Sequence, residues 1–219
     1  MNKETAFSID TTSIKFGSGV TQELGFEIKR LGCDRVMVLT DPGLMDSQVL
    51  AGAIKSLEEE SIDYVIFGNV RVEPTDTSFK EAISFAIEGR FDGFVALGGG
   101  STIDTAKAAN LYSCYQEDFL TFVNPPIGLG KPVPGPLKPL IAIPTTSGTG
   151  SETTGVAIFD LHEIHAKTGI AHRLLRPTMG LVDPTNTVTL HSMVVACSGL
   201  DVLCHGLESY TALNYNNRD

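Results

Sequence analysis

The stretch FVALGGGSTIDTAKAA, residues 94–109, decides the fold of this chain. Its beginning is a short apolar run of the length of a buried strand, and its end is rich in helix-forming residues. Four residues stand where the strand would pass into the helix: Gly98, Gly99, Gly100 and Ser101. Because the N–H groups at a helix N-terminus have no intrahelical acceptor and attract anions, this turn predicts a phosphate-binding site.

The triglycine turn is not the common dinucleotide fingerprint G-x-G-x-x-G, because Ile103 stands where the third glycine would fall. Glycines without a Cβ let the backbone approach an anion closely. We expect Ser101 to cap the helix and Asp104 to reach back as its capping-box partner. The alternative is an ordinary tight turn without a ligand, and three consecutive glycines favour the phosphate site over it.

Similar strand and helix patterns alternate on either side of this unit. Short β-branched runs predict buried parallel strands at 35–40, 63–68, 94–99 and 140–145. Apolar residues at three- and four-residue steps predict helices at 19–31, 46–60, 76–89 and 101–113. This alternation predicts an α/β fold with a doubly wound, mostly parallel Rossmann-like sheet.

The second half of the chain does not continue the regular alternation of strands and helices. Residues 124–139 hold six of the eleven prolines, which predicts a surface loop. The runs VAIFD, GIAHRLL and MGLVD, between residues 156 and 183, are expected to be antiparallel strands, and a helix is expected from about 190 to 212. We therefore expect two domains, a dinucleotide-binding α/β domain (1–183) and the truncated start of a helical metal-binding domain (184–219).

Composition excludes several classes of protein. The formal net charge is −10 and the basic residues do not cluster, so a nucleic acid partner is not expected. The four cysteines form no C-x-x-C pair, which indicates free thiols in a reducing compartment, and no apolar run is long enough to span a membrane. Because residues 1–10 resemble neither a signal peptide nor an Arg-rich presequence, we expect cytoplasm or mitochondrial matrix rather than secretion.

A second ligand-binding loop is predicted after the strand at 140–145. The loop PTTSGTGSETTG, residues 144–155, is rich in hydroxyl groups, and parallel strands bring their carboxyl-terminal loops to one crevice. It could therefore hold ribose and phosphate beside the triglycine turn, although a flexible polar turn would look the same. Asp41, at the end of an earlier strand, could accept hydrogen bonds from a ribose diol and repel a 2′-phosphate, although Asp-Pro is also a turn signal.

Asp201 and His205 are candidate metal ligands. Their spacing of four residues puts a carboxylate and an imidazole on one helix face. An ordinary surface pair would have the same spacing. The remaining histidines show no helical relation to the pair and are not expected to complete a site: His162, His165, His172 and His191.

Three motifs together resemble the iron-containing (group III) alcohol dehydrogenases: GGGSTIDTAK (98–107), PTTSGTGSE (144–152) and GLDVLCHGLESY (199–210). The resemblance runs along essentially the whole chain and corresponds to the N-terminal portion of the family. Further stretches, among them NVRVEPTD (69–76), are most similar to the transhydrogenase branch, whose members pass hydride between a hydroxyacid and an oxoacid.

The resemblance implies NAD and a divalent metal, iron or zinc, as cofactors. It implies that the pyrophosphate is bound at Gly98, Gly99, Gly100, Ser101 and Asp104, and the adenosine side at Thr145, Thr146, Thr149 and Ser151. Lys167 matches a lysine that contacts the cofactor, and Asp41 matches the NAD-selective acid. Asp201 and His205 match two metal ligands whose partners are histidines on later helices, so this chain alone is expected to be inactive.

The implied activity is metal-dependent, NAD-linked hydride transfer between a hydroxyacid such as 4-hydroxybutyrate and an oxoacid such as 2-oxoglutarate. Besides the metal ligands, no catalytic protein base is required. Two alternatives stay open: a dehydrogenase of a simple alcohol or diol, and a nucleotide-binding or interaction module without chemistry. The apolar helix near the C-terminus is expected to expose one face, which predicts self-association, so a homo-oligomer is a possible state.

Overall fold

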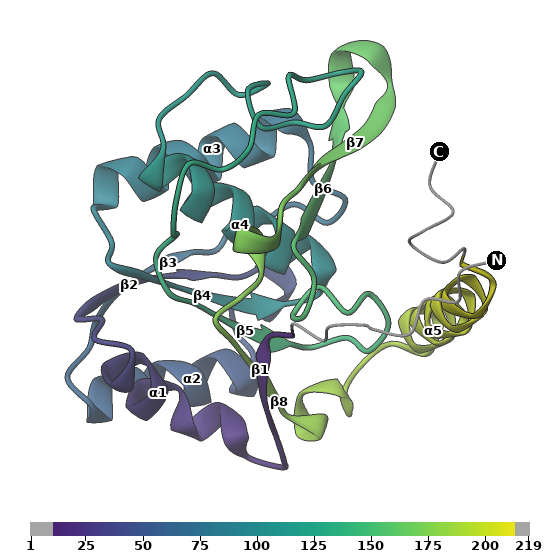
Figure 1. The fold of residues 1–219 in the computed structure, drawn as a ribbon. Helices are drawn as coiled ribbons and strands as arrows, with labels where there is room; N and C mark the ends of the chain where they lie inside the picture. Colours follow the sequence, from purple (N-terminus) through teal and green to yellow (C-terminus); the bar gives the residue numbers. More distant parts are fainter. Residues whose placement is uncertain (1–10, 213–219) are drawn as a thin grey trace, which may run out of the picture.

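The computed structural model describes residues 11–212 (Figure 1). In this part of the chain, six strands form one sheet in the order β1-β8-β5-β4-β2-β3, and every neighbouring pair is parallel. The strands are β1 (Ser13–Phe16), β2 (Arg35–Leu39), β3 (Asp63–Phe67), β4 (Gly93–Gly98), β5 (Leu140–Pro144) and β8 (Met179–Val182). The four strands predicted from apolar runs are all in this sheet, with β4 and β5 at its centre.

Helices cover both faces of the sheet, as Figure 1 shows. Apolar side chains of α1 (Leu24–Arg30) and α2 (Gln48–Glu59) form one buried cluster with the sheet. On the opposite face, α3 (Asp76–Gly89) and α4 (Gly100–Cys114) form a second cluster with β2, β4 and β5. The predicted doubly wound α/β fold is therefore confirmed.

Two strands near the sheet edge correct the sequence prediction. The run MGLVD was expected to form an antiparallel strand, but β8 lies parallel between β1 and β5. A short apolar run has no feature that identifies its partner strand, so only the tertiary structure decides the pairing. Strand β1 was not predicted at all, because it is an edge strand whose Ile14 and Phe16 remain exposed.

The other two predicted antiparallel strands form a separate hairpin. β6 (Val156–Leu161) pairs with β7 (Ala166–Ala171) in an antiparallel two-stranded sheet, which Figure 1 shows rising beyond the α3 and α4 layer. The run GIAHRLL does not continue as a strand, because His172 accepts a hydrogen bond from the Leu174 N–H and starts a 3₁₀ turn. The proline-rich segment 124–139 contains neither helix nor strand, as predicted.

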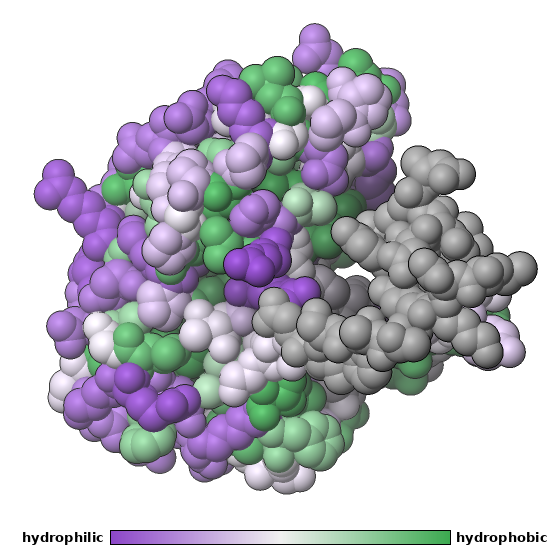
Figure 2. Space-filling model, viewed as in Figure 1, coloured by the Kyte–Doolittle hydropathy of each residue, from purple (hydrophilic) through white to green (hydrophobic). Residues whose placement is uncertain are grey.

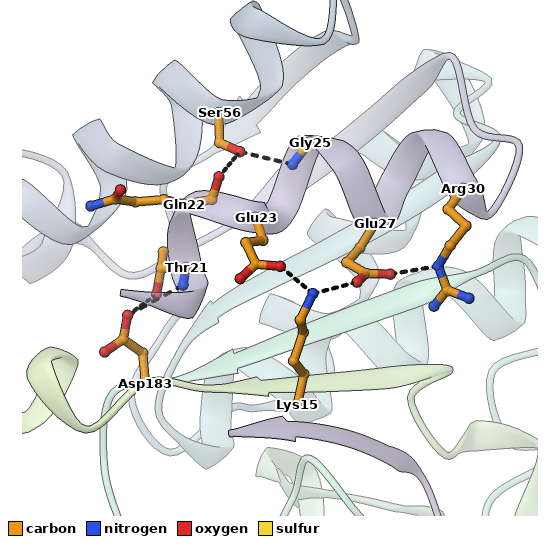
Figure 3. Close-up of polar contacts among 9 residues, drawn as sticks. All are labelled: Lys15, Thr21, Gln22, Glu23, Gly25, Glu27, Arg30, Ser56 and Asp183. Atoms are coloured by element: carbon orange, nitrogen blue, oxygen red, sulfur yellow. Dashed lines mark hydrogen bonds and ion pairs between the residues drawn. The ribbon is translucent and has the colours of Figure 1, made fainter. Parts of the chain in front are cut away.

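An ion-pair network links the edge strand β1 to helix α1 and the residue before it, Glu23 (Figure 3). The Lys15 ammonium contacts Glu23 and lies 2.8 Å from the Glu27 carboxylate, whose other oxygen accepts from Arg30 at 2.7 Å. Burial would raise the pKa of Glu27, but the hydrogen bonds from Lys15 and Arg30 outweigh it and the pKa is lowered. Charge pairing therefore stabilises an edge that has little apolar burial.

Helices α1 and α2 approach closely at Gly25. Its N–H donates to the Ser56 hydroxyl at 2.9 Å, and this hydroxyl donates to the Gln22 carbonyl at 2.6 Å (Figure 3). A Cβ at Gly25 would overlap the Ser56 carbonyl. The close approach therefore requires glycine at this position.

Asp183 joins the end of β8 to the segment before α1. Its buried carboxylate accepts from the Thr21 N–H at 3.2 Å and the Thr21 hydroxyl at 3.0 Å (Figure 3). The other oxygen accepts from the Thr185 N–H and hydroxyl, so the side chain caps a 3₁₀ turn, Pro184–Thr187. Burial opposes ionisation, but these hydrogen bonds outweigh it and lower the pKa of Asp183.

Helix α5 (Ser192–Thr211) lies at the side of the α/β body (Figure 1). None of its residues is buried, and Leu200, Leu203 and Leu207 are each more than half exposed. The predicted exposed apolar face is confirmed, whereas the division into domains at residue 183 stays a prediction. Residues 213–219 of the predicted second domain fall outside the described residues.

The surface of the α/β body carries no continuous apolar face in the view of Figure 2. Hydrophilic residues spread over both helical layers, and apolar residues show as separate patches between them. Within residues 11–212, no helix combines the length and the apolar character that crossing a bilayer requires.

Candidate functional site

The N-terminus of α4 has the geometry of an anion-binding turn. β4 ends at Gly98, Gly99 is the N-cap residue, and no side chain caps the helix. The Gly99 carbonyl accepts from the N–H groups of Thr102 at 3.0 Å and Ile103 at 3.2 Å. The preceding N–H groups, of Gly100 and Ser101, have no intrahelical acceptor and are therefore available to an anion.

The three glycines serve different purposes. A Cβ at Gly98 would overlap the Thr102 side chain, and one at Gly100 would lie 2.9 Å from Thr149 Cγ2. At Gly99 the nearest atom to an added Cβ would be the Thr146 hydroxyl oxygen at 3.4 Å, an ordinary contact. Packing within the protein therefore requires Gly98 and Gly100, whereas Gly99 leaves space that a ligand can use.

The predicted capping box at this turn is wrong. The Ser101 hydroxyl accepts the Glu73 N–H at 3.2 Å instead of capping its own helix. The Asp104 carboxylate accepts the Ile158 N–H of β6 at 3.0 Å and pairs with Lys107 at 3.2 Å. Its partners lie on another element and one turn further along α4, so Asp104 faces away from the helix start.

Asp104 and Lys107 form a buried ion pair beneath the turn. The Lys107 side chain is fully buried, and its ammonium also donates to the Val156 carbonyl at 2.7 Å and the Thr154 hydroxyl at 3.4 Å. Burial raises the pKa of Asp104 and lowers the pKa of Lys107, and in each case the attraction of the partner opposes the shift. The pair joins α4 to the start of β6 and the end of the hydroxyl-rich loop.

Two adjoining cavities open at the carboxyl ends of the strands. The larger cavity has a volume of about 710 Å³ and the smaller cavity about 500 Å³. They share five lining residues: Glu73, Gly100, Ser101, Thr149 and Asp201. Because the two spaces share one wall, an elongated ligand can extend from one into the other.

Most of the predicted site residues line these cavities. Asp41, Gly99, Thr145 and Thr146 line the larger cavity, and Asp104, Ser151, Lys167 and His205 line the smaller one. Gly100, Ser101, Thr149 and Asp201 line both. Gly98 lines neither, because it lies behind the turn as the last residue of β4. Loops far apart in sequence thus meet at one edge of the sheet, as expected for parallel strands.

Asp41 forms the turn that the Asp-Pro pair predicts, whereas its contact with a ribose stays a prediction. One carboxylate oxygen accepts the Gly43 N–H at 2.9 Å and caps a short 3₁₀ turn, Pro42–Leu44. The side chain also lines the larger cavity. A carboxylate has lone pairs left after a single hydrogen bond, so the turn role leaves acceptors for a ligand hydroxyl.

The side chains of Asp201 and His205 lie next to each other on α5. Asp201 Oδ1 is 3.7 Å from His205 Nε2, and both side chains are about half exposed to the smaller cavity and solvent. Two ligands of a tetrahedral ion, each about 2.1 Å from it, lie about 3.4 Å apart. The pair therefore fits a shared divalent cation after a small side-chain rotation.

No third ligand joins this pair within residues 11–212. In that part of the chain no three His, Cys, Asp or Glu side chains gather as a metal site would require. His172 and His191 accept backbone N–H groups at helix starts, and His162 and His165 lie together at the hairpin turn. As expected, none of these four histidines lines the cavity beside Asp201.

The structure adds residues that the sequence did not single out as functional. Three of them line the smaller cavity: Glu73, Pro74 and Asp160 of β6. Glu73 has φ 55°, a left-handed conformation that is uncommon for a residue other than glycine. Arg173 and Arg176 line a separate cavity near Ser13.

A parallel α/β sheet that brings an anion-binding turn and a candidate pair of metal ligands to one crevice is the arrangement expected of an oxidoreductase that uses a nucleotide and a metal. The family model described as iron-containing alcohol dehydrogenase matches residues 11–184. The chain therefore belongs to the iron-containing alcohol dehydrogenase family, as its motifs suggested.

The chain resembles mitochondrial hydroxyacid-oxoacid transhydrogenases in sequence. It is 57% identical over 214 residues to that of Xenopus laevis, and 54% identical over 214 residues to that of Homo sapiens. Each alignment covers 97% of this chain and 46% of the relative. The chain thus spans about half the length of the curated relatives it matches.

Solved structures of the family share the fold. The NADH-dependent butanol dehydrogenase A of Thermotoga maritima superposes with a TM-score of 0.85 at 26% identity, covering 93% of this chain and 50% of that one. The sulfoacetaldehyde reductase of Bifidobacterium kashiwanohense, solved in complex with NAD⁺, gives 0.86 at 25% identity, covering 94% and 54%.

Proposed function

We propose that this chain is the cofactor-binding part of a metal-dependent, NAD-linked oxidoreductase. The observation that carries the proposal is the shared crevice: the anion-binding turn at Gly100 and the pair Asp201–His205 line the same smaller cavity. Hydride transfer requires a dinucleotide and a substrate carbon side by side, and this crevice has room for both.

Each part of the crevice has a role in the proposed complex. The N–H groups of Gly100 and Ser101 bind the diphosphate at the helix N-terminus. The larger cavity takes the adenosine half, with Asp41 accepting from the ribose diol, so NAD is preferred to NADP. The smaller cavity takes the nicotinamide half and the substrate, beside Lys167.

Asp201 and His205 would hold the metal, together with ligands from outside the described residues. If Asp201 and His205 held a divalent iron or zinc ion, it would supply Lewis-acid chemistry, that is, polarisation of a bound hydroxyl oxygen that favours loss of its proton. Asp201 and His205 both line the smaller cavity, so they would hold the ion there. Because a catalytic site needs three or more protein ligands, we expect the chain alone to show no turnover.

The proposed substrates are a hydroxyacid such as 4-hydroxybutyrate and an oxoacid such as 2-oxoglutarate. The support is the 54–57% identity to hydroxyacid-oxoacid transhydrogenases, compared with 26% to the butanol dehydrogenase. A dehydrogenase of simple alcohols has less support for that reason. The same relatives lead us to propose the mitochondrial matrix as the location in a eukaryotic cell.

Calorimetric titration of NAD⁺ into the purified chain tests the proposal. We expect saturable binding in the wild type, loss of binding in Gly99→Val, and weaker binding of NADP⁺ than of NAD⁺. Gly52→Val is the matched control, because an added Cβ at Gly52 of α2 meets no atom within 4 Å. Absence of NAD⁺ binding in the folded wild type, or equal binding in Gly99→Val, would contradict the proposed cofactor role.

A further inference from the structure

A polar cavity lies away from the crevice. It has a volume of about 500 Å³ and is bordered by the residues that begin β1 and by the segment that leads into β8. Of the described residues, none lines both this cavity and a cavity of the crevice. Because the crevice lies at the carboxyl ends of the strands and this cavity near the beginnings of β1 and β8, the two spaces are separate.

The lining of this cavity favours an anion. It combines two arginines with four hydroxyl-bearing residues: Arg173, Arg176, Thr11, Thr12, Ser13 and Thr178. Among the described residues that line it, none is acidic. The chain carries a formal net charge of −10, so its overall field repels anions and only a local group of donors can hold one.

The backbone brings the two arginines to one side. Arg173 begins the 3₁₀ turn Arg173–Leu175, and Arg176 is its C-cap residue. Side chains three residues apart in a 3₁₀ turn lie one above the other, so both can reach the same space. Arg176 also interacts with another group, so the argument rests on Arg173. Within residues 11–212, no hydrogen bond or ion pair is assigned to the Arg173 guanidinium, and its donors are therefore available to a ligand.

Two of the threonines add donors to this space. Thr12 is only 5% exposed, and its side-chain oxygen has no hydrogen-bond partner in the described part of the chain. A buried polar atom without a partner indicates a bound water, ion or ligand. The Thr178 hydroxyl accepts the Leu140 N–H at 3.2 Å, which leaves its own O–H free to donate. The Thr178 N–H donates to the Leu140 carbonyl at 2.8 Å, so β5 holds this wall of the cavity in place.

The arrangement of these donors fits a phosphate group better than a carboxylate. A carboxylate presents two oxygens in one plane, whereas a phosphate group spreads three oxygens around its phosphorus. The donors come from the start of β1, from the 3₁₀ turn and from the start of β8, so they surround the ligand instead of lying in one plane. The planar guanidinium of arginine binds phosphate oxygens in pairs. The cavity volume falls in the range of small-molecule sites, about 300–1,000 Å³.

We propose that this cavity binds a phosphate group, whose oxygens accept hydrogen bonds from the Arg173 guanidinium and from the hydroxyls of Thr12 and Thr178. Rotation of the Thr12 side chain into another staggered conformation turns its unpaired hydroxyl toward the ligand. The site is additional to the proposed cofactor site, and the inference does not depend on the cofactor role.

The test is a titration of the chain in phosphate-free buffer, followed by amide NMR spectra. Inorganic phosphate, methyl phosphate and acetate are compared. The amides of Thr12 and Thr178 report on this cavity, and those of Gly100 and Ser101 report on the anion-binding turn. We expect saturable shifts at Thr12 and Thr178 with phosphate, and roughly tenfold weaker binding of acetate. Saturation by methyl phosphate as well identifies a phosphate monoester as the ligand, whereas shifts with inorganic phosphate alone identify the free ion. Shifts confined to Gly100 and Ser101, or equal binding of acetate, would overturn the inference.

Three variants separate recognition from folding. Arg173→Gln should weaken phosphate binding by about tenfold or more, because a hydrogen bond to a charged group is lost. Arg90→Gln is the matched control, since Arg90 is an exposed arginine at the C-cap of α3 that lines neither this cavity nor the crevice. Thr12→Val should weaken phosphate binding without lowering the melting temperature of the ligand-free protein, because the lost hydroxyl has no partner in the fold. Unchanged phosphate affinity in Arg173→Gln, or a lower melting temperature in Thr12→Val, would contradict the proposed site while leaving the cofactor role intact.

Discussion

Replacing Lys107 by methionine should destabilise the protein strongly, because it breaks a buried ion pair. Lys107 is fully buried, and its ammonium contacts the Asp104 carboxylate, the Val156 carbonyl and the Thr154 hydroxyl. Methionine fills the volume but leaves Asp104 as an unpaired buried carboxylate. Removing one member of such a pair costs about 3–5 kcal/mol.

The assay is urea denaturation followed by circular dichroism at pH 5 and pH 8. In Lys107→Met, burial keeps the pKa of Asp104 above that of the unfolded chain and its main counter-charge is gone. The native state then binds more protons than the unfolded state. The free energy of unfolding therefore falls as the pH rises from the pKa of an aspartate in the unfolded chain, about 3.9, through the pKa of Asp104 in the folded protein. The loss relative to wild type should therefore be larger at pH 8 than at pH 5.

A double-mutant cycle with Asp104→Asn isolates the interaction of the two charges. Asp104→Asn in the Lys107→Met background removes the unpaired charge, keeps an acceptor for the Ile158 N–H, and should recover part of the lost stability. A loss below about 1 kcal/mol in Lys107→Met, the level of an exposed salt bridge, would refute the reasoning. So would strict additivity of the two substitutions.

Three further predictions concern other parts of the structure. Gly25→Ala should lower the free energy of unfolding by about 1–3 kcal/mol, because the added Cβ overlaps the Ser56 carbonyl. Gly52→Ala should raise it slightly, because a Cβ added there meets no atom within 4 Å, and thermal melts of both variants check this. Because its pKa is lowered on folding, ionised Asp183 stabilises the folded state at pH values above its pKa in the unfolded chain, and this contribution disappears as the pH falls through its pKa in the folded protein. In Asp183→Asn, the free energy of unfolding from denaturation curves should therefore depend less on pH below about pH 4 than in the wild type. His205→Ala should lower the affinity of the chain for Zn²⁺ by roughly tenfold or more, with His191→Ala unchanged, in a competitive chelator titration.

Most of the strands that the sequence predicted are those buried on both faces. Strands β2, β4 and β5 are nearly or fully buried, and buried parallel strands appear in sequence as continuous apolar runs. Strand β1 carries no such signal, because its residues are mostly exposed and its side-chain contacts include those of Lys15 with Glu23 and Glu27. Those partners follow it by 8 and 12 residues, in a helix that local periodicity does not connect to a strand.

The same distinction holds for the candidate site. That the loops after β4 and β5 share one crevice follows from the topology of a parallel sheet, so Gly100 and Thr149 could be placed together in advance. The role of Asp104 could not, because its spacing from Ser101 fits a capping box equally well. The N–H that it accepts belongs to Ile158, 54 residues away, and only the folded structure reveals that partner.

The hydroxyl-rich loop connects the anion-binding turn to helix α5. At one end of the turn, a Cβ on Gly100 would lie 2.9 Å from Thr149 Cγ2. One residue earlier in the loop, a Cβ on Gly148 would lie 2.7 Å from the Ser198 carbonyl of α5. Adjacent loop residues therefore lie against the turn at Gly100 and against the helix that carries Asp201. Because both contacts are at the limit of close packing, the loop sets the distance between the proposed diphosphate and the proposed metal, and a larger residue at position 148 would move the two apart.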